Sequence, residues 1–397
     1  MCLINFLSYP RKILLIGATW PKYHSSLGYK IRRTVTLANI LSLLLCLSYN
    51  ASFHMSDFVQ FSESLYMLIS VVNAFLKIVL LTLNGKVFLK LIGMLETPSF
   101  KRFETLYKKI VKDFLKTVKA VEFFYWIEVS GTVLFLSLFP SNSIIPFGSD
   151  FAISECVLVF ESEALPMDFP HFNNGTFHYP FYIFEAFSLF VSAYDNMAVD
   201  LLTVGIISIA AVQLRILNQK LVDTDKNIKN MPNYSVGNVE RLTIGYLTEC
   251  CIHYSDIEKY VKSILEVFSV IIFVQLGTSV VAICNAGMMI LSVKLASIEA
   301  LSLFFYIVTM FAQLGMYCWF GNFVYVESLE VTTSCYLSHW DERGPAVRKT
   351  LFMLMERAKK PLAIRAVKFA TLSFDTFIAI IKWSYSYFAL LNNSMKN

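Results

Sequence analysis

Charged side chains lie inside long apolar runs of the sequence, where an ionisable group could do chemistry out of water, and we single out six of them. They are Glu128, Glu185, Asp195, Asp200, Asp375 and Lys382. Intramembrane carboxylates can serve proton relays, and a charge that faces lipid is costly. No opposing pair of carboxylates is evident, so we expect these side chains to face protein or water.

The sequence carries no motif of a familiar enzymatic centre. It has no Walker loop, no Gly-rich dinucleotide fingerprint, no His-Glu-x-x-His and no Gly-x-Ser-x-Gly. The six histidines are scattered, and the eight cysteines show neither metal spacing nor the density of a secreted disulfide framework. We therefore predict that the protein is not an enzyme and uses no cofactor and no metal.

The composition is that of a membrane protein. Of the 397 residues, 56% belong to the hydrophobic set and only 16% are charged, whereas a soluble domain carries roughly 25% charged residues. The mean hydropathy is +0.57. The net charge of +5 is small, and the basic residues are not interleaved as a nucleic-acid patch. These features favour one membrane domain with no nucleic-acid partner.

Seven stretches are long and apolar enough to cross a hydrocarbon core of ~30 Å, which takes roughly 20 helical residues. They cover residues 34–53, 64–83, 123–145, 181–212, 264–290, 298–324 and 369–391. The first is too long for a cleaved signal and is interpreted as a retained span. The fourth and sixth exceed the bilayer thickness, so their helices are expected to tilt or to project. The fold class predicted is all-α, a polytopic membrane protein with seven transmembrane helices.

Lys and Arg residues alternate between the connections. The basic connections, with six, nine, seven and eight Lys and Arg, are residues 1–33, 84–122, 213–263 and 325–368. Connections 54–63 and 140–180 contain none. A cytosolic N-terminus therefore places 30 of the 34 basic residues on the cytosolic side. Seven crossings then leave the C-terminus extracellular.

This topology is opposite to that of a G-protein-coupled receptor, which begins outside the cell. The chain also lacks Asp-Arg-Tyr after its third span, and a Ser-Tyr-Ser-Tyr run at 384–387 stands where such a receptor has Asn-Pro-x-x-Tyr. Asn174 begins an Asn-Gly-Thr glycosylation acceptor in a predicted extracellular loop. The acceptor predicts a glycoprotein and supports the topology weakly.

The C-terminal third carries a specific series of short motifs. They are Gln313 to Asn322 (QLGMYCWFGN), Glu327-Ser328, Tyr336, Trp340, Lys360-Pro361, Lys368-Phe369, Leu372-Ser373 and Tyr385 to Leu391 (YSYFALL). In these motifs and their spacing the chain resembles the insect odorant receptor family. The earlier part of the chain agrees in topology, in loop sizes and in features such as Lys77, late in the second span.

The resemblance implies a ligand-gated, non-selective cation channel made of four subunits around one pore. An odorant-tuning subunit assembles with the olfactory co-receptor as a heterotetramer and binds a volatile odorant. It is expected in the plasma membrane, in the dendrite of an olfactory sensory neuron, with membrane lipid and permeating cations as further partners. Two alternatives remain open, a gustatory-type receptor channel of the same fold and a small-solute membrane transporter. The C-terminal motif opposes the first, and the lack of symmetric halves opposes the second.

The same resemblance assigns a pore and an assembly segment. The last span lines the pore, and its hydrophobic constriction falls on Leu390, where apolar side chains can stop ions by dewetting the passage. Asn393 follows at i+3 and offers a polar surface above this gate. Tyr336 and Trp340 lie in the cytosolic segment through which subunits assemble. Ordinary packing within one subunit is the alternative for Leu390, Tyr336 and Trp340.

In the family the odorant pocket lies in the outer half of the bundle, among the second to sixth spans. An apolar pocket with a few hydroxyls and aromatic rings suffices for a volatile ligand. Each aromatic candidate has a role in the core as its alternative. The ligand-binding candidates at helical spacing are Ser70, Asn73, Ser130, Gly131, Leu134, Phe187, Val191, Tyr194, Phe305, Tyr306 and Thr309.

These expectations divide the chain into four segments. In order they are a cytosolic N-terminal segment (1–33), spans one to six with the pocket (34–324), a cytosolic anchor and assembly segment (325–368), and the pore-lining seventh span with a short extracellular tail (369–397).

Overall fold

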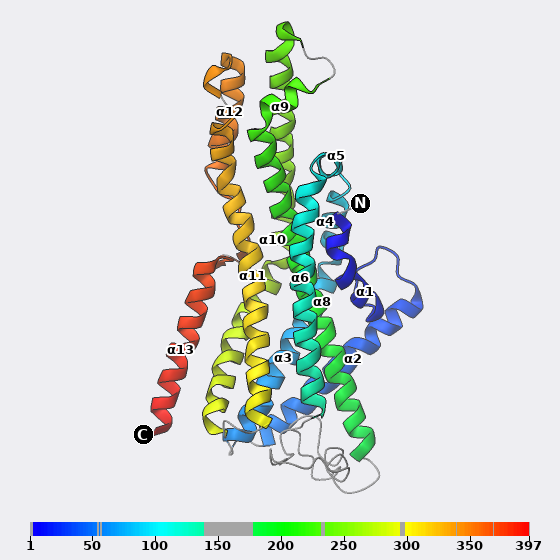
Figure 1. Ribbon diagram of the computed structural model, residues 1–397. Coiled ribbons are helices and arrows are strands. Elements are labelled where there is room, and N and C mark those ends of the chain that lie inside the picture. The colour runs from blue at the N-terminus through cyan, green and yellow to red at the C-terminus, as the bar shows by residue number, and fades with distance from the viewer. Residues whose placement is uncertain are drawn as a thin grey trace, which may run out of the picture.

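The computed structural model describes residues 3–53, 55, 58–138, 178–231, 235–293, 298–338, 340–367 and 369–396. This part of the chain is an elongated bundle of helices (Figure 1). Its long helices are α2 (Leu27–Phe53), α3 (Phe58–Leu83), α6 (Lys108–Leu138), α8 (His178–Val222), α10 (Val239–Ser292), α11 (Ile298–Tyr336) and α13 (Phe374–Lys396). The short elements are η1 (Leu3–Leu7), α1 (Ser8–Ile16), α4 (Gly85–Met94), α5 (Pro98–Leu106), α9 (Thr224–Lys229), η2 (Val236–Asn238), η3 (Trp340–Glu342), α12 (Pro345–Ala358), β1 (Arg365–Ala366) and β2 (Ala370–Thr371).

The long helices coincide with the seven predicted spans, and the all-α fold class is confirmed. Within the described residues, six helices are long and apolar enough to cross a membrane, namely α2, α3, α6, α8, α10 and α11. The last helix, α13, has 23 residues, which correspond to about 35 Å at the α-helical rise. That length also suffices for a crossing.

Several helices begin before or after their apolar windows, and α10 begins furthest away, at Val239 rather than near residue 264. Helix α6 starts at Lys108 because its first turns are amphipathic and bury Val111, Phe114 and Val118 at helical spacing. Helix α13 starts at Phe374, after a short antiparallel pairing of β1 with β2 in which Ala366 faces Ala370.

Helix α8 is the centre of the bundle. Every residue from Met197 to Leu214 is buried, and a helix that is apolar on all sides must be enclosed by others. It contacts α1, α2, α3, α6, α10 and α11. The N-terminal η1 also packs against it, with Phe6 and Leu7 buried. This approach requires Gly205, since a Cβ there would lie 2.8 Å from the carbonyl oxygen of Phe6.

Three helices are much longer than a bilayer is thick. Helices α8, α10 and α11 have 45, 54 and 39 residues, or about 68, 81 and 58 Å. In Figure 1 they extend to the end of the bundle that carries α9 and α12, whereas the C-terminus of α13 lies at the opposite end. Residues 213–263 and 325–368 therefore build a helical extension beyond the apolar spans, as their alternation of apolar and charged positions predicts.

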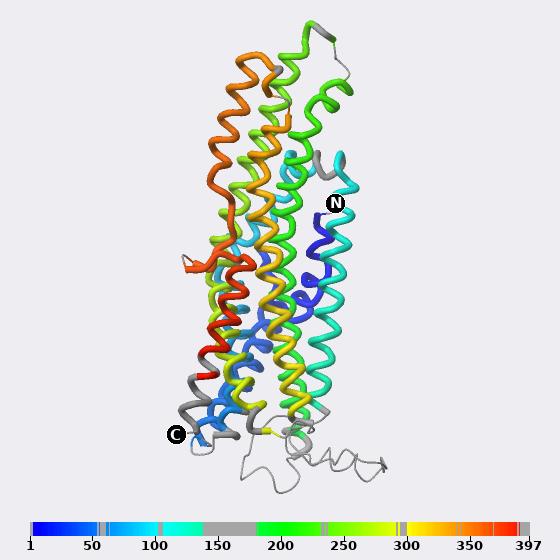
Figure 2. Tube along the Cα trace, turned by 60° about the vertical axis from the view of Figure 1, so that its left-hand side comes forward, coloured from blue at the N-terminus to red at the C-terminus, as the bar shows by residue number. Residues whose placement is uncertain are grey.

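The last helix, α13, lies on the outside of the bundle against α10 and α11 (Figure 2). The chain reaches it from α12 through the β1–β2 turn, which packs on α11 at Gly321. A Cβ at Gly321 would lie 2.9 Å from the carbonyl oxygen of Leu372 and closer still to its Cβ. This glycine therefore sets how closely α11 and the start of α13 approach.

Candidate functional site

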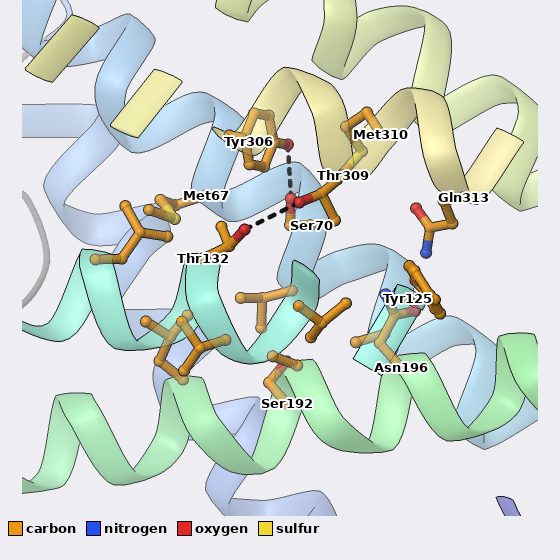
Figure 3. A pocket seen from close by; sticks show the side chains of 17 residues that line it. Met67, Ser70, Tyr125, Thr132, Ser192, Asn196, Tyr306, Thr309, Met310 and Gln313 are labelled. Carbon is orange, nitrogen blue, oxygen red and sulfur yellow. Dashed lines mark hydrogen bonds between the residues drawn. The ribbon is translucent and has the colours of Figure 1, made fainter. Parts of the chain in front are cut away.

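An internal cavity of about 80 Å³ lies between α3, α6, α8 and α11 (Figure 3). Each of these helices lines it with residues at i, i+3, i+4 and i+7, which form one helical face. Tyr125 of α6 lies at one end. The four faces are Met67, Ser70, Val71 and Ala74 of α3, Val129, Thr132, Val133 and Leu136 of α6, Leu189, Ser192, Ala193 and Asn196 of α8, and Tyr306, Thr309, Met310 and Gln313 of α11.

The cavity lies near the end of the bundle that holds the C-terminus of α13. Helix α6 ends there at Leu138, and α11 begins there at Ile298. Lining residues Leu136 and Tyr306 are two and eight residues from those helix ends. The cavity thus occupies the half of the bundle that the topology analysis predicts to be extracellular.

Two pairs of hydroxyl groups lie among the mostly apolar side chains of the wall (Figure 3). Ser70 Oγ and the Tyr306 hydroxyl are 2.7 Å apart, and the Oγ1 atoms of Thr132 and Thr309 are 3.1 Å apart. Because hydroxyls both donate and accept, a ligand can exchange these hydrogen bonds for its own. An apolar cavity with a few convergent polar groups is typical of a small-molecule site.

The floor of the cavity is formed by Tyr125, Asn196 and Gln313, and a buried ion pair lies directly behind it. Lys77 Nζ lies 2.5 Å from Asp200 Oδ1, and both side chains are fully buried. Lys77 also donates to Asn196 Oδ1 at 2.9 Å, and the Tyr125 hydroxyl donates to Asp200 Oδ2 at 3.1 Å. Asn196 and Tyr125 line the cavity. The pair is therefore one hydrogen bond away from any ligand in the cavity.

Two residues of the QLGMYCWFGN motif complete the hydrogen bonds around this ion pair. Gln313 donates to Asp200 Oδ2 and accepts from Gln275 Nε2 at 2.8 Å, and the Tyr317 hydroxyl donates to Asp200 Oδ1 at 2.7 Å. Asp200 thus receives hydrogen bonds from α3, α6 and α11 at once. This explains why a carboxylate is tolerated on the central helix, because both of its oxygens receive hydrogen bonds.

Of the predicted ligand-binding residues, Ser70, Tyr306 and Thr309 line the cavity. Asn73 is buried one turn away and donates to Gln275 Oε1 at 2.8 Å. Ser130 lies outside the cavity, where its hydroxyl is 2.8 Å from that of Tyr194.

The remaining candidates also lie outside the cavity. Gly131 and Phe305 line a separate groove between α6 and α11. Leu134 and Phe187 point away from the bundle, with 60% and 59% of their surface exposed. Val191 is half-buried and does not line the cavity.

The structure describes the side chains of the predicted assembly residues but not those of the predicted gate residues. Leu390 and Asn393 belong to the last turns of α13, but their side chains lie outside the described part of the chain, as does Asn174. Tyr336 ends α11 with 62% of its surface exposed, and its ring centroid is 6.3 Å from that of the half-buried Trp340.

Sequence reasoning missed most of the cavity's wall. On α6 the lining face is Val129, Thr132 and Val133, whereas the candidates were Ser130, Gly131 and Leu134. A rotation by one residue, about 100°, brings Ser130 and Leu134 onto the lining positions Val129 and Val133, but it does not bring Gly131 onto a lining position. The aromatic pair Phe123–Phe124, exposed on the outer side of α6, is the signal in the sequence that could have set this rotation.

A model of the 7tm odorant receptor family matches residues 57–385. The chain belongs to the insect odorant receptor family. Among its relatives in sequence, odorant receptor 94a of Drosophila melanogaster is 26% identical over 214 residues, which are 53% of each chain. Odorant receptor Or2 of Anopheles gambiae is 24% identical over 182 residues, 46% of this chain and 47% of that receptor. The odorant receptor coreceptor of Aedes aegypti is 24% identical over 170 residues, 42% of this chain and 35% of the coreceptor.

These alignments span about half the length, or less, of the relatives they match. The fold extends over the whole chain. The structure of olfactory receptor OR5 from Machilis hrabei in complex with eugenol superimposes with a TM-score of 0.78, covers 99% of both chains and is 14% identical. Family members are receptors and not enzymes, in agreement with the prediction. Within the described residues, no group of three or more His, Cys, Asp or Glu side chains could hold a metal ion.

Proposed function

We propose that this chain is the odorant-binding tuning subunit of a heteromeric, ligand-gated, non-selective cation channel, and that the odorant occupies the cavity between α3, α6, α8 and α11. The cavity carries the proposal because it combines apolar walls with two hydroxyl pairs, the chemistry that a small volatile needs. The structure of OR5 from Machilis hrabei with eugenol supports a small aromatic ligand in this fold.

The orientation belongs to the same proposal. Basic residues gather in the connections at the end that carries α9 and α12, so that end is cytosolic and the N-terminus with it. The cavity then lies in the outer half of the bundle, and the C-terminus is extracellular in the plasma membrane. Asn174, in the 140–180 connection, is glycosylated on the same side.

The partner is an olfactory co-receptor, and four subunits surround one pore. The similarity to the coreceptor of Aedes aegypti supports a shared mode of assembly. Tyr336 and Trp340 act in assembly, since aromatic rings are favoured at protein interfaces and Tyr336 is exposed beside Trp340. Leu390 forms the apolar constriction of α13, and Asn393 the polar surface next to it.

Ligand binding reaches the pore through the floor of the cavity. A ligand opens a channel only when it binds the open state more tightly than the closed state. Asn196, Tyr125 and Gln313 line the cavity and also hold the Lys77–Asp200 pair. Helix α11 connects this floor to α13, with which it is in contact.

Whole-cell current under a panel of volatile odorants tests the proposal, with the chain expressed with and without a co-receptor. We expect an odorant-evoked cation current only when both are present. Odorant-evoked current from the chain alone, or solute flux without unitary currents, would contradict the role of a tuning subunit. Surface labelling of the chain and a response of the co-receptor to its own agonist are the controls.

A substitution in α13 tests the gate. Leu390→Ala widens an apolar ring that blocks ions by dewetting, so we expect higher current without odorant and altered relative permeabilities. Ile378→Ala, three turns earlier on the same helix and 49% exposed, makes the same kind of truncation away from the gate and should leave permeation unchanged. Equal effects of the two substitutions would place the constriction elsewhere.

A further inference from the structure

A second, larger hollow lies between α6 and α11 and opens on the outer face of the bundle. Its volume is about 650 Å³, within the range of sites for small molecules. Its rim is formed by Phe124, Ile127 and Trp319, of which 69%, 46% and 49% is exposed. Figure 1 shows α6 and α11 side by side at this face. We call this hollow the lateral groove.

Small residues on both helices create the space. Gly131 of α6 and Gly315 of α11 line the lateral groove, and a Cβ on Gly131 would meet nothing within 4 Å. The nearest atom to a Cβ on Gly315 is a ring carbon of Phe377 at 3.9 Å. The walls are otherwise aromatic and aliphatic, so the groove accepts an apolar chain or ring.

One acidic side chain, Glu128, lines this apolar groove. Its Oε1 accepts a hydrogen bond from Thr309 Oγ1. Its Oε2 is buried and has no hydrogen-bond partner among the described residues, and no Lys, Arg or His of that part of the chain forms an ion pair with it. A carboxylate in this setting is costly unless a donor or a cation reaches it.

We propose that the lateral groove is a second ligand site, for hydrophobic primary amines. The ammonium group donates to Glu128 Oε2 and supplies the missing positive charge, and the apolar part lies between α6 and α11 along Phe305 and Trp319. A neutral alcohol or hydrocarbon of the same size gains the apolar contacts only. The site therefore selects for charge, whereas the internal cavity holds no unpaired acid.

The lateral groove shares its inner wall with the cavity. Tyr125 lines both, and Thr309, which donates to Glu128, lines the cavity. An amine bound at Glu128 Oε2 leaves Oε1 to the Thr309 hydroxyl, so the two donors share the carboxylate. The two sites are thus distinct but adjacent, and the amine site does not depend on the identity of the ligand in the cavity.

Trp319 offers a direct readout of occupancy on the full chain in lipid nanodiscs. The probes are 8-bromooctylamine and 8-bromooctanol, whose bromine quenches tryptophan fluorescence on contact. The signal of Trp319 is the difference between the unsubstituted chain and a Trp319→Phe variant. We expect Glu128→Gln to raise the half-saturating concentration of the amine by about tenfold or more and to leave that of the alcohol unchanged. Lipid partitioning cancels, since each probe is compared with itself.

A groove-filling variant, Gly131→Leu, is a second test in case the Glu128→Gln variant misfolds. It keeps Glu128 and occupies the space next to it, so we expect it to abolish quenching of Trp319 by both probes. Identical amine curves for the unsubstituted chain and Glu128→Gln would overturn the proposal. Absence of Trp319 quenching by the amine in the unsubstituted chain would overturn it as well.

Discussion

Lys77 and Asp200 carry opposite charges in the interior of the bundle, and each charge compensates the other. Their side chains are fully buried, so removal of one leaves an uncompensated charge in a low-dielectric interior. The pair is also tied to Asn196 and Tyr125, which line the cavity. The stability of the bundle and the wall of the proposed ligand cavity therefore depend on the same residues.

Removal of Lys77 is expected to be strongly destabilising. Lys77→Met should lower the free energy of unfolding by about 3–5 kcal/mol, the usual cost of breaking a buried pair from one side. Adding Asp200→Asn removes the orphaned charge and should recover part of the loss. The midpoint of thermal unfolding in detergent and the fraction at the cell surface measure both. A single variant as stable as the unsubstituted chain would show that the pair is not needed.

Ser328, which belongs to the Glu327-Ser328 motif, has a structural role. Its fully buried hydroxyl accepts a hydrogen bond from the backbone N–H of Leu362 at 2.7 Å, and so ties α11 to the segment after α12. Ser328→Ala leaves that N–H without its partner and should cost about 1–3 kcal/mol of stability.

Arg357 provides the matched comparison for Ser328. It donates to Glu258 Oε2 at 2.6 Å and ties α12 to α10, but 55% of its side chain is exposed. Arg357→Gln should cost less than about 1 kcal/mol, as expected for an exposed ion pair. The melting temperatures of Ser328→Ala and Arg357→Gln are the test. A larger loss of stability for Arg357→Gln would contradict the view that the buried hydrogen bond of Ser328 contributes more than the exposed ion pair.

At the scale of elements, a glycine of α11 allows the chain just before α13 to approach closely. Gly321→Val places a branched side chain against the backbone of Leu372. Its Cβ atom alone would lie 2.9 Å from the carbonyl oxygen of Leu372. We expect a loss of folding or a displaced α13, seen as reduced surface expression and altered gating. Gly245→Ala is the control, since a Cβ there meets nothing within 4 Å in the interior of α10. The control should be neutral or slightly stabilising.

The existence of the helices could be predicted from the sequence, and their rotation could not. Length and apolar content decide whether a segment spans a bilayer, and each of the seven predicted spans overlaps a long helix. Which side faces the cavity depends on neighbours that are distant in the chain. The candidates Ser130 and Leu134 are therefore displaced from the lining residues Val129 and Val133 by a rotation about the axis of α6.

The β1–β2 pairing was missed for a different reason. Each strand has two residues, too few for the alternation of apolar and polar residues that predicts a strand. The pairing is fixed by tertiary packing, with Ala366 and Leu372 both fully buried.

At the scale of the whole molecule, one central helix connects the cavity to the rest of the bundle. Helix α8 contributes Ser192 and Asn196 to the cavity and Asp200 to the ion pair behind its floor. It continues for six further turns, about 33 Å, to the end that carries α9 and α12. A single helix thus links the wall of the cavity to the end of the bundle at which we propose that subunits assemble. The sequence alone does not show that α8 contributes to the cavity or that it connects the cavity to the other end of the bundle.

Two neighbouring residues of α6 test whether the odorant binds in the cavity. Val133 lines it and is 8% exposed, whereas Leu134 faces outward and is 60% exposed. Val133→Phe places a ring in the ligand's space, and Leu134→Phe makes a similar change on the outer surface. With an odorant that activates the co-expressed receptor, we expect Val133→Phe to raise its half-maximal concentration about tenfold or more, a loss of ~1.4 kcal/mol, or to abolish the response. Leu134→Phe should leave the response unchanged. The opposite order, at equal surface expression, would contradict the assignment of the cavity as the odorant site.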